Sequence, residues 1–165
     1  MTELTQPQLA AKRLEDMEAI KRLKYRYLRC VDTKQWSDLA GCFAPEATTD
    51  YGGKYRHNGV DAIMVFMRKY NPPEVITMHQ VHHPEIELTG AGTARATWML
   101  EDYVISLPGD WSIHGTALYH DEYVKIAGEW KIRHTGYQRI FSERWARSDI
   151  KSLKVTESMH TPPPK

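Results

Sequence analysis

The chain has 165 residues, and its 22 Lys and Arg residues almost balance its 21 Asp and Glu residues, which gives a net charge of +1 with neutral histidine. Such a balance lacks the basic excess that is typical of nucleic-acid-binding proteins, and no run of residues is apolar enough to provide the roughly 20 residues that cross a bilayer. We therefore expect one domain with no nucleic-acid partner and no membrane partner.

The two ends of the chain differ in character from its middle. Residues 1–10 lack the basic and then apolar layout of a signal peptide and are interpreted as a leader, whereas residues 151–165 end in Pro-Pro-Pro-Lys and are interpreted as a disordered tail. The two cysteines, Cys30 and Cys42, are too few for a disulfide scaffold and indicate a cytoplasmic location. A single domain over residues 11–150 follows.

Helical periodicity dominates the first part of this domain. A helix is expected over residues 11–31, because apolar residues recur there at three- and four-residue steps. That apolar stripe consists of Leu14, Met17, Ile20, Leu23, Tyr27 and Val31. A second, shorter helix is expected over residues 35–42, where Pro45 would end it, and a third over residues 59–70.

The remaining segments have the composition of strands. A hairpin is expected at Gly52-Gly53 between residues 47–51 and 54–58. The longer segments are rich in β-branched and aromatic residues and are separated by turns, so we expect an antiparallel meander. Its four strands would cover residues 75–88, 93–107, 111–126 and 129–141. Helices followed by a long, strongly curved antiparallel sheet predict an α+β fold that encloses a pocket beneath the helices.

Three of the eight histidines lie between His79 and His83. Histidine exchanges a proton near neutral pH, so we interpret His79 as the general base of an active site without a metal. A metal site is the alternative, but these histidines do not match a standard zinc spacing. On a regular strand His79 and His83 would face one way and His82 the other.

One residue of the first helix and one residue just past its end are candidates to act with His79. Asp32 follows the helix and is either a capping residue or a carboxylate that orients His79. Tyr27 lies on the apolar stripe, so its hydroxyl points inward and needs a partner. It is either a core tyrosine or a donor to a substrate oxygen.

Asp102 is the one acid on the apolar face of its predicted strand. An acid there is costly unless it is paired or functional, and a structural ion pair is as good an explanation as a catalytic role. Arg139 would be its natural partner if that side chain points inward. In a regular strand Tyr137, Arg139 and Phe141 share one face.

Four stretches together resemble the nuclear transport factor 2-like superfamily, and within it the SnoaL-like group of cyclases, isomerases and dehydratases. They are residues 19–32, 77–79, 98–102 and 135–140. The resemblance runs from about residue 15 to residue 150 and implies a cone-shaped fold. It is greatest to the bile acid 7α-dehydratases, which carry the same residue types at positions that match Tyr27, Asp32, His79, Asp102 and Arg139.

The resemblance implies a cofactor-independent lyase that removes water from a hydroxylated steroid or bile-acid-like ring through a His79–Asp32 pair. The same pair recurs in scytalone dehydratases and hexachlorocyclohexane dehydrochlorinases, so it indicates elimination more than it indicates a substrate. The substrate wall would include Trp98, Leu100, Met64, Met67 and Phe141.

The resemblance also implies a homo-oligomer, with a trimer favoured over a dimer. The absence of a P-loop or a dinucleotide fingerprint is in keeping with a reaction that uses no cofactor. Two other functions remain open. One is an isomerase or cyclase of a polyketide-like or steroid-like substrate with the same pair, and the other is a non-catalytic small-ligand-binding module.

Overall fold

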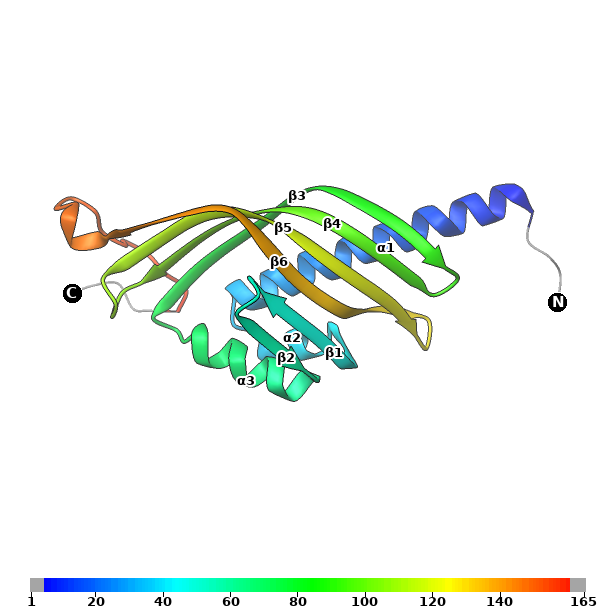
Figure 1. Cartoon of the computed structure of the whole chain (residues 1–165), viewed down its shortest axis with the longest axis horizontal. Helices are drawn as coiled ribbons and strands as arrows, with labels where there is room; N and C mark the ends of the chain where they lie inside the picture. Colours follow the sequence, from blue (N-terminus) through cyan, green and yellow to red (C-terminus); the bar gives the residue numbers. More distant parts are fainter. Residues whose placement is uncertain (1–4, 161–165) are drawn as a thin grey trace.

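A computed structural model describes residues 5–160 of the chain (Figure 1). Its elements are α1 (Gln6–Asp32), α2 (Trp36–Ala40), β1 (Phe43–Tyr51), β2 (Tyr55–Asn58), α3 (Val60–Tyr70), β3 (Val75–Gly90), β4 (Thr93–Ser106), β5 (Trp111–Ile126), β6 (Glu129–Ala146) and a 3-10 turn at Arg147–Asp149. Helices cover one side of a strongly curved sheet, and α1 runs along the concave side (Figure 1). The predicted α+β fold is confirmed.

The first helix is longer than the sequence pattern predicts. It begins at Gln6 rather than near residue 11, and the Gln8 side chain accepts a 2.8 Å hydrogen bond from the Thr5 backbone N–H at its start. Half of the expected leader is therefore helical. These first turns project beyond the sheet (Figure 1), so residues 5–15 are exposed and Leu14 does not join the core. Residues 1–4 of the leader and 161–165 of the tail lie outside the described residues.

The sheet has six strands in the order β2-β1-β6-β5-β4-β3. The four long strands form the predicted antiparallel meander, and β1 and β2 form the predicted hairpin. However, β1 begins at Phe43 and pairs in parallel with β6, so the sheet is mixed rather than wholly antiparallel. Pro45 lies inside β1, where the register with β6 shifts, because a proline cannot donate to a regular ladder.

The core fills the space between α1 and the concave face. Ile20 and Leu39 from the helices and Trp98 and Ile132 from the sheet are fully buried. A cavity of about 180 Å³ remains beside this core, with walls contributed by α1, α3 and the six strands. None of the helices within residues 5–160 combines the length and the hydropathy that crossing a membrane requires.

Position along α1 decides how much a side chain contributes to stability. Ile20 is fully buried and Leu14 is 64 % exposed on the same helix. We expect Ile20→Ala to lower the free energy of unfolding by about 2–5 kcal/mol, because it opens a cavity in the core. Leu14→Ala is expected to change it by less than about 0.5 kcal/mol. Urea denaturation of both variants checks this, and equal losses would contradict the assigned packing of α1.

Candidate active site

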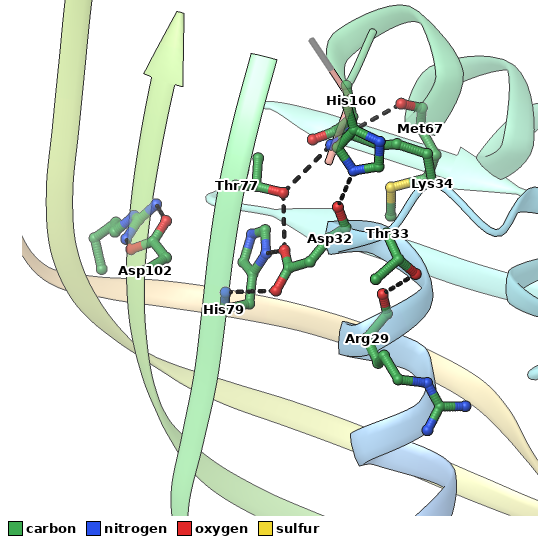
Figure 2. Close-up of polar contacts among 11 residues, drawn as sticks. Arg29, Asp32, Thr33, Lys34, Met67, Thr77, His79, Asp102 and His160 are labelled. Carbon is green, nitrogen blue, oxygen red and sulfur yellow. Dashed lines mark hydrogen bonds and ion pairs between the residues drawn. The ribbon is translucent and has the colours of Figure 1, made fainter. Parts of the chain in front are cut away.

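The end of α1 meets β3 at a carboxylate and an imidazole (Figure 2). Asp32 is the last residue of α1, and its Oδ1 lies 2.6 Å from His79 Nδ1. Its Oδ2 accepts the backbone N–H of His79 at 2.9 Å. A carboxylate only accepts, so Nδ1 carries the proton of the neutral ring. Since His79 lines the cavity, Nε2 is the basic nitrogen left for a ligand.

Further polar groups hold this carboxylate in place. Thr77 lies two residues before His79 on the same side of β3 and donates its hydroxyl to Asp32 Oδ1 at 2.8 Å. Lys34 donates to the Thr77 hydroxyl at 3.4 Å. Burial lowers the pKa of Lys34, and attraction to Asp32 opposes that shift. The Asp32 carboxylate is thus held by several hydrogen bonds, and Asp32 is not an exposed capping residue.

The described part of the C-terminal tail returns to this end of α1. His160 Nε2 lies 2.8 Å from the backbone carbonyl oxygen of Asp32 (Figure 2). That carbonyl belongs to the last turn of the helix, where carbonyls lack an intrahelical partner. Residues 154–160 form neither helix nor strand, yet the tail is anchored beside the site through this contact.

Several tyrosines line the same cavity. Tyr27 and Tyr51 lie with their hydroxyl oxygens 3.0 Å apart, and Tyr119 and Tyr137 line the same space. Burial raises the pKa of Tyr27, Tyr51 and Tyr119 well above the ordinary value for a phenol. These side chains therefore stay protonated at neutral pH and can donate hydrogen bonds to a ligand oxygen.

The predicted pairing of Asp102 with Arg139 is present. Arg139 binds Asp102 through two N–H groups, and Nη2 lies 2.7 Å from Oδ2. Burial acts to lower the pKa of Arg139, but its bonds to Asp102 outweigh burial and raise it, so the guanidinium stays charged. Asp102 lies opposite His79 in the β3–β4 register, which places the ion pair next to the imidazole in the cavity.

A glycine and a bulge explain how the guanidinium fits. Gly115 is the partner of Asp102 on β5, and a Cβ there would lie 3.0 Å from Arg139 Nη1 and 2.8 Å from the Phe141 carbonyl oxygen. On the neighbouring strand, β6 contains one extra residue. Arg139 pairs with Ala117 of β5 and Phe141 pairs with Thr116, which leaves Ile140 between them without a partner in the register. The bulge at Ile140 turns the side chains beyond it to the other face.

The structure therefore corrects the prediction for Phe141. Its side chain is 50 % exposed and packs edge-on against His114, with ring centroids 6.4 Å apart, away from the cavity. Leu100 and Met67 line the cavity as predicted. Trp98 and Met64 are buried in the core rather than at the cavity wall.

The three histidines between positions 79 and 83 do not point to a common site. The β3–β4 register shifts between His82 and Glu85, and His83 has a left-handed backbone (φ 49°). Both His82 and His83 are exposed, while His79 faces the cavity. Among residues 5–160, no group of three or more His, Cys, Asp or Glu side chains is arranged to hold a metal ion.

Sequence reasoning missed tyrosines of the cavity wall and a threonine that binds Asp32. Tyr119 alternates with Ala117 and Asp121 on one face of β5, and that pattern alone places it inward. Thr77 precedes His79 by two residues, which places both on the same face of the strand. Tyr51 lies at the end of β1, and its inward direction depends on the parallel pairing with β6, which no local pattern announces.

Known proteins match this chain in both sequence and structure. The sequence profile of the SnoaL-like domain matches residues 12–136. A hexachlorocyclohexane dehydrochlorinase of type 2 superposes with a TM-score of 0.77 at 21% identity, over 94% of this chain and 98% of that one. A candidate scytalone dehydratase from Novosphingobium aromaticivorans gives a TM-score of 0.76 at 19% identity, over 81% of this chain and 90% of that one. At these identities the structures establish a shared fold.

The geometry at His79 fixes which ring nitrogen carries the proton. At a pH where the imidazole is neutral, we expect nitrogen NMR shifts to show a proton on Nδ1 and none on Nε2. In Asp32→Asn an amide replaces the obligate acceptor, so we expect the Nε2–H form to increase. His114, which contacts Glu101 at 3.0 Å, serves as the control and should give the same spectrum in both proteins. A parent protein with the proton on Nε2 would refute the arrangement.

Proposed function

The chain belongs to the SnoaL-like family, and we propose that it is a dehydratase that uses only its own side chains to remove water from a hydroxylated ring ketone. The observation that carries this proposal is the Asp32–His79 contact of 2.6 Å at the wall of a cavity lined with phenols. An oriented base and fixed donors are what proton removal beside a carbonyl requires. The names of the two similar enzymes, a dehydrochlorinase and a candidate dehydratase, both describe eliminations.

The proposed reaction moves one proton and breaks one carbon–oxygen bond. His79 Nε2 takes a proton from a carbon that a conjugated carbonyl has made acidic. The electron pair left on that carbon is delocalised onto the carbonyl oxygen, where Tyr27 and its neighbours donate hydrogen bonds. The pair then forms the new double bond as the hydroxyl leaves with the proton from His79. The products are water and an unsaturated ketone, and His79 returns to its neutral form.

Arg139 and Asp102 have a different proposed role. Their charges balance each other, so this end of the cavity presents a fixed dipole rather than a free cation. It would orient a neutral polar group of the ligand more readily than it would bind a carboxylate. The matching residue types in bile acid 7α-dehydratases support a steroid or bile-acid-like substrate.

Cavity size limits how such a substrate is held. The volume of about 180 Å³ lies below the roughly 300–1,000 Å³ of common ligand pockets. A steroid would therefore place one end of its ring system inside and leave the rest at the mouth. Smaller two-ring ketones of the polyketide type would be enclosed more completely, and they are the second class to test.

We also propose that the protein is a homotrimer that associates through the outer face of the sheet. Ile140 and Phe141 are 55 % and 50 % exposed on β6, and together they form an apolar surface next to the bulge. Light scattering should give three times the mass of one chain for the parent. Replacing both residues with serine should yield monomers. A monomeric parent would contradict association, and a dimeric parent would contradict the trimer.

The function is tested by mass spectrometry on purified protein without added cofactor. With 3-oxo-Δ4 steroids and bile acids that carry hydroxyls at different positions, we expect a product lighter by one water. His79→Ala should lower kcat by about 10²–10⁴-fold, because it removes the general base. His82→Ala changes an exposed histidine on the same strand and should retain the parent rate.

Other outcomes would overturn different parts of the proposal. A product of unchanged mass would establish an isomerase. A folded His79→Ala variant with full activity would refute the assignment of the base. No turnover of any steroid would remove the steroid assignment, and two-ring ketones would then be screened.

A further inference from the structure

A lysine and an aspartate are buried behind the cavity, outside the set of groups used above. Lys24 lies on α1 and Asp121 on β5, and both side chains are fully removed from solvent. Lys24 Nζ is 2.8 Å from Asp121 Oδ2. Neither residue lines the cavity. Such a pair gains little in stability over well-packed apolar residues, so its presence calls for another reason.

The lysine contacts the faces of two tyrosines that do line the cavity. Its Nζ lies 3.4 Å from the centre of the Tyr119 ring and 4.9 Å from the centre of the Tyr27 ring. Tyr27 and Tyr119 also line the cavity. The cationic end of a buried ion pair therefore contacts the phenols that would donate to a substrate oxygen.

Asp121 and its neighbours form a connected set of buried hydrogen bonds around the lysine. Asp121 Oδ2 also accepts the Tyr123 hydroxyl at 2.6 Å, and Tyr123 in turn accepts Trp98 Nε1 at 3.1 Å. Burial lowers the pKa of Lys24, whereas the charge and the hydrogen bond of Asp121 oppose this shift. The contact with Asp121 therefore opposes the loss of the proton from Lys24.

The pair is not arranged for the greatest stability. Both Lys24 and Tyr123 bind the same oxygen of Asp121, and its Oδ1 is buried without a partner within the described residues. A buried acceptor without a donor has a free-energy cost. Besides Asp121, the lysine contacts the Thr135 hydroxyl at 3.5 Å and the faces of the two tyrosine rings.

We propose that Lys24 is a positioning residue that strengthens the hydrogen bonds of Tyr119 and Tyr27 to negative charge on a ligand oxygen. This inference rests on the proposed function in one respect, because it takes the developing charge to be the carbonyl oxygen of the substrate. A cation on the face of a phenol withdraws electron density, so the hydroxyl becomes a stronger donor. Burial removes the screening of this charge by water, while the opposite charge of Asp121, which acts to raise the pKa of Tyr27 and of Tyr119, limits the effect.

The chain provides a matched control in a second lysine–aspartate pair. Lys125 on β5 binds Asp16 on α1, and Lys125 Nζ lies 5.0 Å from the centre of the Trp130 ring. The two pairs join the same helix to the same strand, but neither Lys125 nor Asp16 lines the cavity. Lys24→Met with Asp121→Asn is therefore compared with Lys125→Met with Asp16→Asn.

The readout is the ionisation of bound 4-nitrophenol, whose phenolate absorbs visible light. We expect the parent and the Lys125 control to bind the phenolate in preference to the phenol. In the Lys24 double variant the ratio of phenolate affinity to phenol affinity should fall about tenfold. This corresponds to a rise of about one unit in the pKa of the bound probe. In steroid turnover the same variant should lower kcat about tenfold and change KM by less than about twofold.

These outcomes separate the inference from the function on which it rests. A Lys24 variant with the parent's preference for phenolate, or a parent with no such preference, would overturn the inference whatever the activity. The phenolate preference of the probe could fall in the Lys24 variant although the parent turns over no ring ketone. That result would support the positioning role of Lys24 and refute the dehydratase. If the double variant fails to fold, Lys24→Gln with Asp121→Asn takes its place in the same test. That second variant keeps a hydrogen bond between the two side chains without their charges.

Discussion

The carboxylate of Asp32 joins the helix to the sheet and also orients the imidazole that lines the cavity. It accepts bonds from the Thr77 hydroxyl, the His79 ring and the His79 backbone N–H. Because β3 is an edge strand, that N–H would otherwise lack a partner in the sheet. The direction of α1, the edge of the sheet and the orientation of His79 therefore depend on one side chain. Changes at Asp32 will affect folding and function together, so the two effects must be measured separately.

Two ion pairs bring opposite charges into the cone. Asp102 with Arg139 and Lys24 with Asp121 each bring opposite charges together next to apolar and aromatic walls. The phenols between them remain neutral because burial raises the pKa values of Tyr27, Tyr51 and Tyr119. A ligand oxygen that becomes negative would thus meet donors that are already in place, and little reorganisation would be needed during the reaction.

The sequence predicts much of this arrangement where a residue's direction depends on local alternation. Asp102 stands out as an acid on an apolar strand face, and Arg139 follows as its partner. The prediction that Phe141 points inward fails because one extra residue at Ile140 reverses the alternation of side chains. A bulge of this kind leaves no clear signal in the amino-acid sequence. The pairing of Asp32 with His79 came from family resemblance, since 47 positions separate them and spacing carries no such information.

Lys24 shows the limit of pattern reasoning most clearly. On a helix rich in Lys and Arg it looks like one more solvated residue, yet it is fully buried because its position falls on the inner face with Ile20 and Tyr27. Asp121 is equally inconspicuous on β5. Only the packing of α1 against the sheet brings the two together, and parallel pairing of β1 with β6 similarly places Tyr51.

The claim that His79 is the general base is tested most directly by proton exchange. A cyclic ketone that binds the cavity would be incubated in D₂O, and loss of the proton signal beside its conjugated carbonyl would be followed by NMR. The account predicts exchange catalysed by the parent and abolished in a folded His79→Ala variant. Equal exchange in both proteins would contradict it, because the proton would then be taken by another group.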